Sequence, residues 1–399
     1  MDEIAARLAR ARRPVLLPGA GVRIAGAVES LHRLLDVAGI PVATAFNAHD
    51  LIADHHPLAV GRPGTIGNRG GNFAVQDADF VLVLGCRLNI RQISYNWQSF
   101  ARNGTVVMVD IDRHELAKPT LNVDLPVHAD LAEFLPRLAA RVDPSLATRI
   151  APWASLCKAR HHRYPVVLPE YWKKEPVNPY CFMDVLSDHL PADAVVVTGD
   201  ATACITAFQA LRLKQGQRLY SNSGSASMGY DLPAAIGAAK TGLAREIVCL
   251  AGDGSIMMNL QELQTIVGQD LPIKIFLLNN RGYHSIRQTQ MAYFPDSLVG
   301  FSPATGVTFP DWQRLSGGFG IPYRRAERPV ELEAAVADTL KASGPQLCEI
   351  LVDPEQPFSP RIASRRLEDG TMVSSPLEDM FPFLPRDELA ENMTGEQDP

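Results

Sequence analysis

The chain has 399 residues, of which 46% are hydrophobic and 21% charged, and its formal net charge is −6. This composition is typical of a globular protein, the length predicts two domains, and the absence of a long basic run argues against a nucleic-acid partner. No apolar stretch reaches the roughly 20 residues of a membrane span, and we expect no signal peptide. The scattered cysteines lack a Cys-x-x-Cys pair, which favours reduced thiols in the cytoplasm over disulfides or a zinc site.

The first predicted block runs from residue 1 to residue 144. It begins with a helix at 4–12, and apolar runs follow at 15–17, 80–84 and 106–109. Continuous apolar runs that are bounded by Gly or Asp and separated by helical patterns are typical of parallel strands buried on both faces. The block is therefore predicted to be a doubly wound α/β domain.

A second α/β block is predicted at 178–353, after a linker at 145–177. Asn178 is a suitable helix N-cap at its start, and the alternation of strands and helices predicts a second parallel, doubly wound sheet. Residues 354–399 are predicted to form a C-terminal arm and tail, with disorder after Glu388. The predicted strands of the second block are 195–198, 247–250, 273–278 and 348–352, and its predicted helices are 232–240, 256–267 and 330–342.

The most informative motif is Gly252-Asp253-Gly254-Ser255, which follows one predicted strand, together with Asn279-Asn280, which follows the next. Ligands bind outside the carboxyl ends of the strands in a doubly wound sheet, and the ends of neighbouring strands lie about 5 Å apart. The Asp253 carboxylate, the Asn280 side chain and the Gly282 carbonyl are therefore expected to share one Mg²⁺. Two diphosphate oxygens and a water would complete its six ligands.

The turn after the first of these strands also suits a phosphate. Gly252 and Gly254 let the backbone approach the phosphates, and the helix that begins near Ser255 directs free N–H groups at them. Each motif alone is more often an ordinary tight turn. Both motifs at this spacing, each after an apolar strand, favour a metal and diphosphate site.

Gly252-Asp253-Gly254 and Asn279-Asn280 together resemble the cofactor motif of the acetolactate synthase-like family of thiamine diphosphate enzymes. The resemblance covers nearly the whole chain and is most specific in the second block. It implies two doubly wound parallel-sheet domains, a central domain and a diphosphate-binding domain. The other similar segments are 13–22 at the start of the central domain, 223–238 at the opening of the diphosphate-binding domain, and 376–380 near the C-terminus.

The resemblance implies roles for individual residues. Asp253, Asn280 and the carbonyl of Gly282 would bind Mg²⁺. Met228 would be the apolar wedge that bends the cofactor, a task that suits an adaptable side chain, although a plain core position is the alternative. The carbonyl of Ala226 would accept a hydrogen bond from the 4′-amino group of the cofactor. The residues expected at the diphosphate are Gly199, Asp200, Ala201, Thr202, Gly252, Gly254 and Ser255.

The roles of three polar side chains near these motifs are open. Asp200 departs from the uncharged residue of many synthases, and a carboxylate beside a diphosphate is repulsive unless it is offset. His284 would transfer protons if it faces the substrate, or would lie in a surface loop. Arg287 would bind a carboxylate or pair with a surface acid, and the second interpretation is favoured.

No residue corresponds to the glutamate that activates the pyrimidine ring in this family. That glutamate lies on an N-terminal pyrimidine-binding domain, whereas residue 1 already resembles the central domain. Glu262 is expected to be structural, and Glu115 belongs to the first block. The chain alone is therefore expected to bind the diphosphate without catalysing. The favoured explanation is a split enzyme whose partner subunit supplies the glutamate; a part of a longer protein and a non-catalytic binding or regulatory subunit are the alternatives.

The function that the resemblance implies is carboligation. The chain is predicted to be the large subunit of a split carboligase, which decarboxylates a 2-keto acid, favoured to be pyruvate, and transfers the acyl-anion unit to a second carbonyl such as that of a ketosugar. A 2-keto acid decarboxylase of the same family is the alternative. Because such sites lie between two chains, a homo- or hetero-oligomer is expected, with no nucleic-acid or membrane partner.

The first block raises the question of a second cofactor. Acetolactate synthases bind FAD with the corresponding domain, through a glycine-rich loop similar to 61–72 and an arginine in the position of Arg87. Glycines also serve ordinary loops, and many relatives have lost the flavin, so a flavin-free domain is favoured over FAD. Gly19-Ala20-Gly21 would suit a nicotinamide cofactor, but Ile24 stands where the third glycine of that motif belongs.

Overall fold

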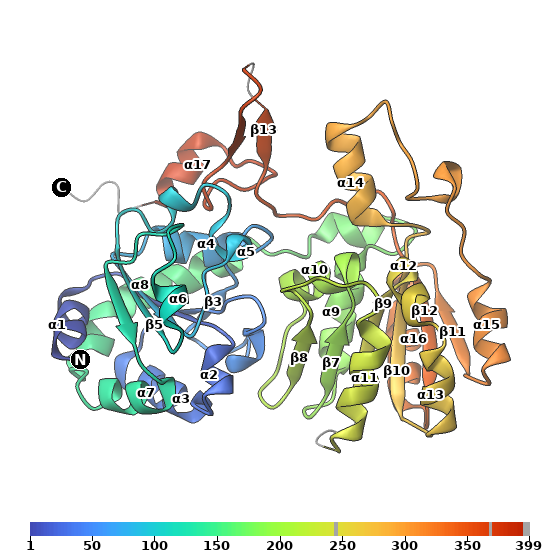
Figure 1. Ribbon diagram of the computed structural model, residues 1–399, viewed down its shortest axis with the longest axis horizontal. Coiled ribbons are helices and arrows are strands. Elements are labelled where there is room, and N and C mark those ends of the chain that lie inside the picture. The colour runs from blue at the N-terminus through green and yellow to red at the C-terminus, as the bar shows by residue number, and fades with distance from the viewer. Residues whose placement is uncertain (243–245, 367–368, 394–399) are drawn as a thin grey trace. The chain divides into compact units, whose positions relative to one another are not determined.

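The chain forms two compact units, each drawn with its own sheet and helices in Figure 1. Unit 1 comprises Met1–Val166 and the C-terminal residues from Ser359 onward, and unit 2 comprises Val167–Phe358. The residues described by this computed structural model are 1–242, 246–366 and 369–393.

Unit 1 contains a six-stranded sheet in which neighbouring strands are parallel. Its strands are β1 (Pro14–Pro18), β2 (Val42–Ala43), β3 (Ala59–Gly61), β4 (Phe80–Leu84), β5 (Thr105–Asp110) and β6 (Leu125–His128). Their spatial order is β3-β2-β1-β4-β5-β6, so the order reverses between β1 and β4. Its main helices are α1 (Asp2–Arg10), α2 (Gly21–Ile24), α3 (Val28–Ala38), α4 (Arg69–Gln76), α5 (Ile90–Ile93), α6 (Arg113–Leu116), α7 (Leu131–Ala139) and α8 (Ser145–Arg163), with short 3-10 helices η1 (His49–Leu51) and η2 (Trp97–Ser99).

The predicted strands of the first block are confirmed as β1, β4 and β5, and every residue of β1 and β4 is buried. The helix expected at 4–12 is α1, which begins and ends two residues earlier. β2 and β3 were not predicted, because two or three residues are too few to show a pattern. The segment 145–177, expected as a linker, contains α8 and the 3-10 helix η3 (Pro169–Lys173), and α8 packs against α4.

Unit 2 contains a second six-stranded sheet with parallel neighbours. Its strands are β7 (Val195–Thr198), β8 (Arg218–Ser221), β9 (Ile247–Gly252), β10 (Ile273–Asn279), β11 (Tyr323–Ala326) and β12 (Gln346–Leu351). Their order is β11-β12-β10-β9-β7-β8, so this order reverses between β7 and β9. Its helices are α9 (Pro179–His189), α10 (Ala201–Ala210), α11 (Asp231–Lys240), α12 (Asp253–Ile256), α13 (Glu262–Gly268), α14 (His284–Tyr293), α15 (Trp312–Gly318) and α16 (Leu332–Lys341), with η4 (Met257–Asn259), η5 (Pro303–Thr305) and η6 (Pro329–Glu331).

All four predicted strands of the second block are found, as β7, β9, β10 and β12. β9 and β10 are neighbours, and Leu278 lies opposite Gly252 in their ladder, as the metal-site hypothesis requires. The single helix expected at 256–267 is wrong: it is divided into α12, η4 and α13. At this break, where η4 ends, the Asn259 side chain donates a hydrogen bond to the Gly229 carbonyl at 2.7 Å.

The C-terminal residues form an arm that is counted with unit 1. Its elements are the antiparallel pair β13 (Ser364–Arg366) and β14 (Met372–Ser374), and helix α17 (Arg386–Glu391). The expected disorder after Glu388 is wrong as far as Glu391, because α17 extends to that residue, while 394–399 lie outside the described residues. None of the described helices is long and apolar enough to cross a membrane.

Candidate functional site

A cavity opens at the carboxyl ends of β7, β9 and β10, beside the order reversal of the second sheet. Doubly wound sheets bind their ligands at such a reversal, because the connections on either side of it leave the sheet in opposite directions. The chain segments after three strands therefore meet here. The described residues that line the cavity are Asp200, Ala201, Thr202, Met228, Gly252, Asp253, Gly254, Ser255, Asn280, Gly282, Tyr283, His284, Ser285 and Ile286.

Asp253 is a buried acid of this cavity, with 1% of its surface exposed. Its Oδ1 accepts a hydrogen bond from Gly254 N at 2.8 Å, and its Oδ2 accepts one from Gly282 N at 3.0 Å. Burial raises the pKa of Asp253 to about 7, although the backbone hydrogen bonds oppose this shift. A cation beside the carboxylate would offset the cost of burying its charge, so the acid fits a metal ligand.

The side-chain oxygen of Asn280 is a buried acceptor without a hydrogen-bond partner, while its Nδ2 donates to Thr202 Oγ1 at 3.3 Å. Buried polar atoms are nearly always paired, so this unpaired oxygen indicates a ligand position. A carboxylate and an amide oxygen at one cavity are the donors that Mg²⁺ prefers. Within the described residues no group of three His, Cys, Asp or Glu side chains could hold a metal, so a site here depends on such mixed oxygen donors.

Gly282 and Gly252 of the cavity differ in the space around a Cβ atom. A Cβ at Gly282 would lie 2.1 Å from the Phe301 carbonyl oxygen, so packing requires glycine there. A Cβ at Gly252 would meet nothing within 4 Å. The backbone at Gly252 therefore borders open space, which is the condition for a close approach by a phosphate.

Ser255 ties two segments of the site together. Its Oγ donates to Asp231 Oδ2 at 2.6 Å and accepts from Gly229 N at 2.9 Å. Asp231 is fully buried, and burial raises the pKa of its carboxyl above the usual value. This hydroxyl thus holds the segment after Met228 against the start of α12. Asp231 was not predicted as a site residue, and its place in the first turn of α11 is the signal that was available.

The remaining predicted residues divide into two groups. Met228 lines the cavity and is half-buried, so its role as the apolar wedge stays a prediction. Gly199 and Ala226 are not among the described lining residues. A Cβ at Gly199 would lie 2.5 Å from Asp231 Oδ2, and Ala226 has a φ of 51°, in the left-handed region that favours glycine.

His284 lies at the start of α14 and is 6% exposed, so its interpretation as a surface loop residue is wrong. Its ring packs edge-on against Phe358 at 5.0 Å between centroids, and its Nε2 is 2.6 Å from Gln288 Nε2. Burial lowers the pKa of His284 to about 4, so the ring is neutral at neutral pH. Arg287 pairs with Glu355, which is the favoured interpretation for this arginine.

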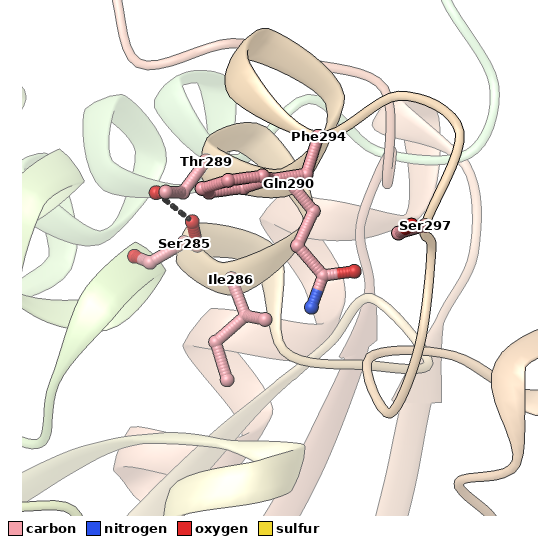
Figure 2. A pocket seen from close by; sticks show the side chains of 6 residues that line it. All are labelled: Ser285, Ile286, Thr289, Gln290, Phe294 and Ser297. Atoms are coloured by element: carbon pink, nitrogen blue, oxygen red, sulfur yellow. Dashed lines mark hydrogen bonds between the residues drawn. The ribbon is translucent and has the colours of Figure 1, made fainter.

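A second cavity runs along α14, and Figure 2 shows the side chains that line it. Ser285 and Ile286 line both cavities, so the two are adjacent. Large apolar side chains are exposed on α14 and on the loop after it, a region that we call the α14 apolar segment. Exposed apolar groups that lie together mark interaction surfaces. The exposed residues of this segment are Ile286, Met291, Tyr293, Phe294, Leu298 and Val299.

The glycine-rich loop of unit 1 is occupied by its own contacts. Asn68 Oδ1 accepts from Arg62 N at 3.1 Å, and Asn72 Oδ1 accepts from Gly64 N at 2.8 Å. Arg87, the position that the resemblance associates with FAD, donates to Glu115 Oε1 at 2.6 Å. These contacts give the loop a structural role, whereas Arg87 forms an ion pair at the surface. The flavin-free domain stays a prediction.

Two family models match most of the chain. The model for the thiamine pyrophosphate enzyme central domain matches residues 1–138, and the one for the C-terminal TPP binding domain matches residues 197–350. The chain carries these two domains of the thiamine pyrophosphate enzymes. The second match contains the motifs after β9 and β10, so the thiamine pyrophosphate (thiamine diphosphate) binding domain is the one that holds the first cavity.

Curated relatives of these thiamine pyrophosphate enzyme domains are acetolactate synthases. The chain is 30% identical over 376 residues to a probable acetolactate synthase 2, chloroplastic, of Oryza sativa subsp. japonica, covering 91% of this chain and 56% of the relative. It is 29% identical over 366 residues to the acetolactate synthase isozyme 1 large subunit of Escherichia coli K12, covering 90% and 62%. It is 30% identical over 350 residues to the acetolactate synthase isozyme 2 large subunit of that organism, covering 87% of this chain and 61% of the relative. The chain thus spans about three fifths of the length of these relatives.

Proposed function

We propose that the chain is the large subunit of a split thiamine diphosphate-dependent carboligase. It would decarboxylate a 2-keto acid, pyruvate in the first instance, and transfer the acyl-anion unit to a second carbonyl. The single observation that carries the cofactor site is the buried, unpartnered Asn280 Oδ1, which lines the same cavity as the buried Asp253. The acetolactate synthase names of the relatives support the reaction class.

In this proposal the residues of the cavity bind and orient. Asp253, Asn280 and the Gly282 carbonyl would hold Mg²⁺, and the open backbone at Gly252 would receive the diphosphate. Met228 supports the cofactor ring from the apolar side. When bound, thiamine diphosphate would supply a nucleophilic carbon for the 2-keto acid and a sink for the charge left by loss of CO₂.

Asp200 and His284 have distinct parts in this proposal. Asp200 lines the cavity and is half-buried, so the repulsion between its carboxylate and the diphosphate has to be offset by Mg²⁺. The neutral His284 can accept or donate a proton at its ring nitrogens, but Gln288 holds Nε2. Its side chain therefore orients groups in the cavity more readily than it delivers a proton at neutral pH.

We further propose that a pyrimidine-binding domain on a partner subunit supplies the activating glutamate. No described residue that lines the cavity is a glutamate. The α14 apolar segment lies beside the cavity and exposes apolar side chains that a partner would cover. All six cysteines are buried and free, and on this ground we place the proposed enzyme in a reducing cytoplasm.

The test is pyruvate consumption and CO₂ release with thiamine diphosphate and Mg²⁺, for the chain alone and with a candidate pyrimidine-domain polypeptide. Turnover in the mixture alone supports the split enzyme. Turnover by the chain alone contradicts the proposed partner. CO₂ release with free aldehyde as the sole product would favour the decarboxylase, whereas no turnover together with loss of cofactor binding would favour a non-catalytic subunit.

A further inference from the structure

A buried polar cluster lies behind the turn that follows β10. It consists of Asn279, Tyr323 and Glu349 and is called the Glu349 cluster here; none of its members is among the described residues lining the cavity. Glu349 lies on β12 and is 3% exposed. Its Oε1 accepts a hydrogen bond from Asn279 Nδ2, and its Oε2 accepts one from Tyr323 OH. Arg325, opposite Glu349 in the ladder, places Nε 3.8 Å from Oε2.

Asn279 connects this cluster with the proposed metal site. Its Oδ1 accepts a hydrogen bond from Arg281 N at 2.9 Å. Arg281 has a φ of 57°, a conformation that non-glycine residues seldom adopt without support from their surroundings. The next residue, Gly282, donates its N–H to Asp253 Oδ2 at 3.0 Å. A continuous series of hydrogen bonds therefore runs from Glu349 through Asn279 and the turn to Asp253.

The side chain of Asn280 has little of its own to fix its direction. Its Nδ2 makes one long hydrogen bond of 3.3 Å to Thr202 Oγ1, and its Oδ1 has no partner. The position of Oδ1 therefore depends on the backbone of the turn, which Asn279 holds on one side and Asp253 on the other.

We propose that Glu349 is a positioning residue of the metal site. Through Asn279 it holds the turn in the conformation that presents Asn280 and Gly282 to the cavity. Partners behind the ligands of a metal commonly set its affinity in this way, by orienting groups that they do not replace. The inference rests on the proposed function, because the turn is held for a metal ion.

The matched set of variants is Glu349→Gln, Asn279→Ala, the double variant, and Ile350→Ala. Glu349→Gln removes the charge while it keeps the shape, so the bond to Asn279 loses its charge-assisted strength. Ile350 is fully buried on the same strand, and its side chain points to the opposite face of the sheet. It therefore reports the effect of a core defect in β12 that does not touch Asn279.

The experiment is calorimetric titration of each variant with Mg²⁺ at saturating thiamine diphosphate, together with urea unfolding of the ligand-free chain. Glu349→Gln and Asn279→Ala should each weaken Mg²⁺ binding about tenfold or more. The double variant should bind no more weakly than the weaker single variant, because both changes remove one connection. Ile350→Ala should lose stability and keep its Mg²⁺ affinity within about twofold.

Wild-type Mg²⁺ affinity in Glu349→Gln, or losses that add in the double variant, would overturn the inference and leave the proposed function intact. If Glu349→Gln does not fold, Asn279→Ala decides alone, and an unchanged affinity overturns the inference. Failure of the wild-type chain to bind thiamine diphosphate with Mg²⁺ would overturn the proposed function first, and the positioning role with it.

Discussion

The two units have the same kind of sheet but differ at the point where the strand order reverses. Both reversals begin with one backbone bond, from Gly19 N to the Leu84 carbonyl at 2.9 Å in unit 1 and from Gly199 N to the Leu250 carbonyl at 2.8 Å in unit 2. Beyond that shared hydrogen bond, the structures of the two reversals differ. A shared topology therefore creates the opportunity for a site at both reversals, and local residues decide whether it is used.

In unit 1 the reversal is closed by backbone. Gly21 N donates to the Gly85 carbonyl at 3.0 Å, and a Cβ at Gly19 would lie 2.4 Å from the same oxygen. In unit 2 a Cβ at Gly199 would likewise lie 2.5 Å from Asp231 Oδ2, but the region is open at Gly252 and presents the unpartnered oxygen of Asn280. Open space together with an unsatisfied buried acceptor distinguishes a binding site from a packed turn. The following variants test that distinction, in order of the expected effect on cofactor binding.

Asp253→Ala should have the largest effect. It removes the carboxylate that holds Mg²⁺, so Mg²⁺-dependent thiamine diphosphate binding should fall by at least about 100-fold. Isothermal titration calorimetry measures it. Asp110→Ala, which removes a largely buried acid at the end of β5 in unit 1, is the control and should bind like the wild type. Equal loss in both variants would contradict the assignment of the site to unit 2.

Asn280→Ala should weaken binding about 10- to 100-fold and change the stability of the ligand-free chain little, because Oδ1 has no bond to lose and Nδ2 loses one long bond of 3.3 Å to Thr202 Oγ1. Asn72→Ala in unit 1 should do the reverse. Asn72 is fully buried and bonds both backbone groups of Gly64, so its loss should cost about 1–3 kcal/mol without affecting the cofactor. Urea unfolding and cofactor titration distinguish the two. A large stability loss in Asn280→Ala would contradict the claim that Asn280 Oδ1 is unpaired in the ligand-free chain.

A glycine pair tests open space against closed backbone. Gly252→Ala places a methyl group where nothing lies within 4 Å, so stability should change by less than about 0.5 kcal/mol while cofactor affinity falls several-fold. Gly19→Ala forces a methyl group against the backbone of Gly85 and should cost about 1–3 kcal/mol with unchanged cofactor affinity. If Gly252→Ala binds the cofactor normally, the phosphates do not approach this backbone.

The smallest effect on the cofactor is expected from His161→Gln in unit 1. Burial lowers the pKa of His161 to about 3, whereas an unfolded histidine titrates near 6.5. Between these values the unfolded chain binds the extra proton, so this residue's contribution to stability falls as the pH is lowered from about 6.5 towards 3. His161→Gln should flatten that slope in acid unfolding experiments and leave binding at pH 7 unchanged. An identical slope in both proteins would contradict the lowered pKa of the half-buried His161.

The parts of the fold that the sequence predicted are those with a local cause. β7 and β9 are largely apolar runs, and β10 is apolar from Ile275 to Leu278 with Lys274 near its start. A parallel sheet that is buried on both faces requires such runs. Asp253 and Asn280 follow two of these strands, so the sheet rule alone brings them to one edge. The site residues that could be predicted were therefore those at strand ends.

The parts that were missed depend on contacts between distant segments. His284 is buried because Phe358 packs on it from beyond β12, and no local pattern near His284 shows this. The helix at 256–267 breaks where Asn259 bonds Gly229, a partner thirty positions earlier in the chain. Glu349 lies inside the predicted strand 348–352 and was assigned no role, although its hydrogen bonds to Asn279 and Tyr323 connect it with the metal turn.

The most direct test of the central claim is calorimetric titration of the wild-type chain with thiamine diphosphate, in Mg²⁺ and in excess chelator, beside Asp253→Ala. We expect saturable binding of one cofactor per chain in Mg²⁺ and loss of that binding in chelator and in the variant. Binding that ignores Mg²⁺, or that is unchanged in Asp253→Ala, would contradict a metal-held diphosphate at the reversal of the second sheet.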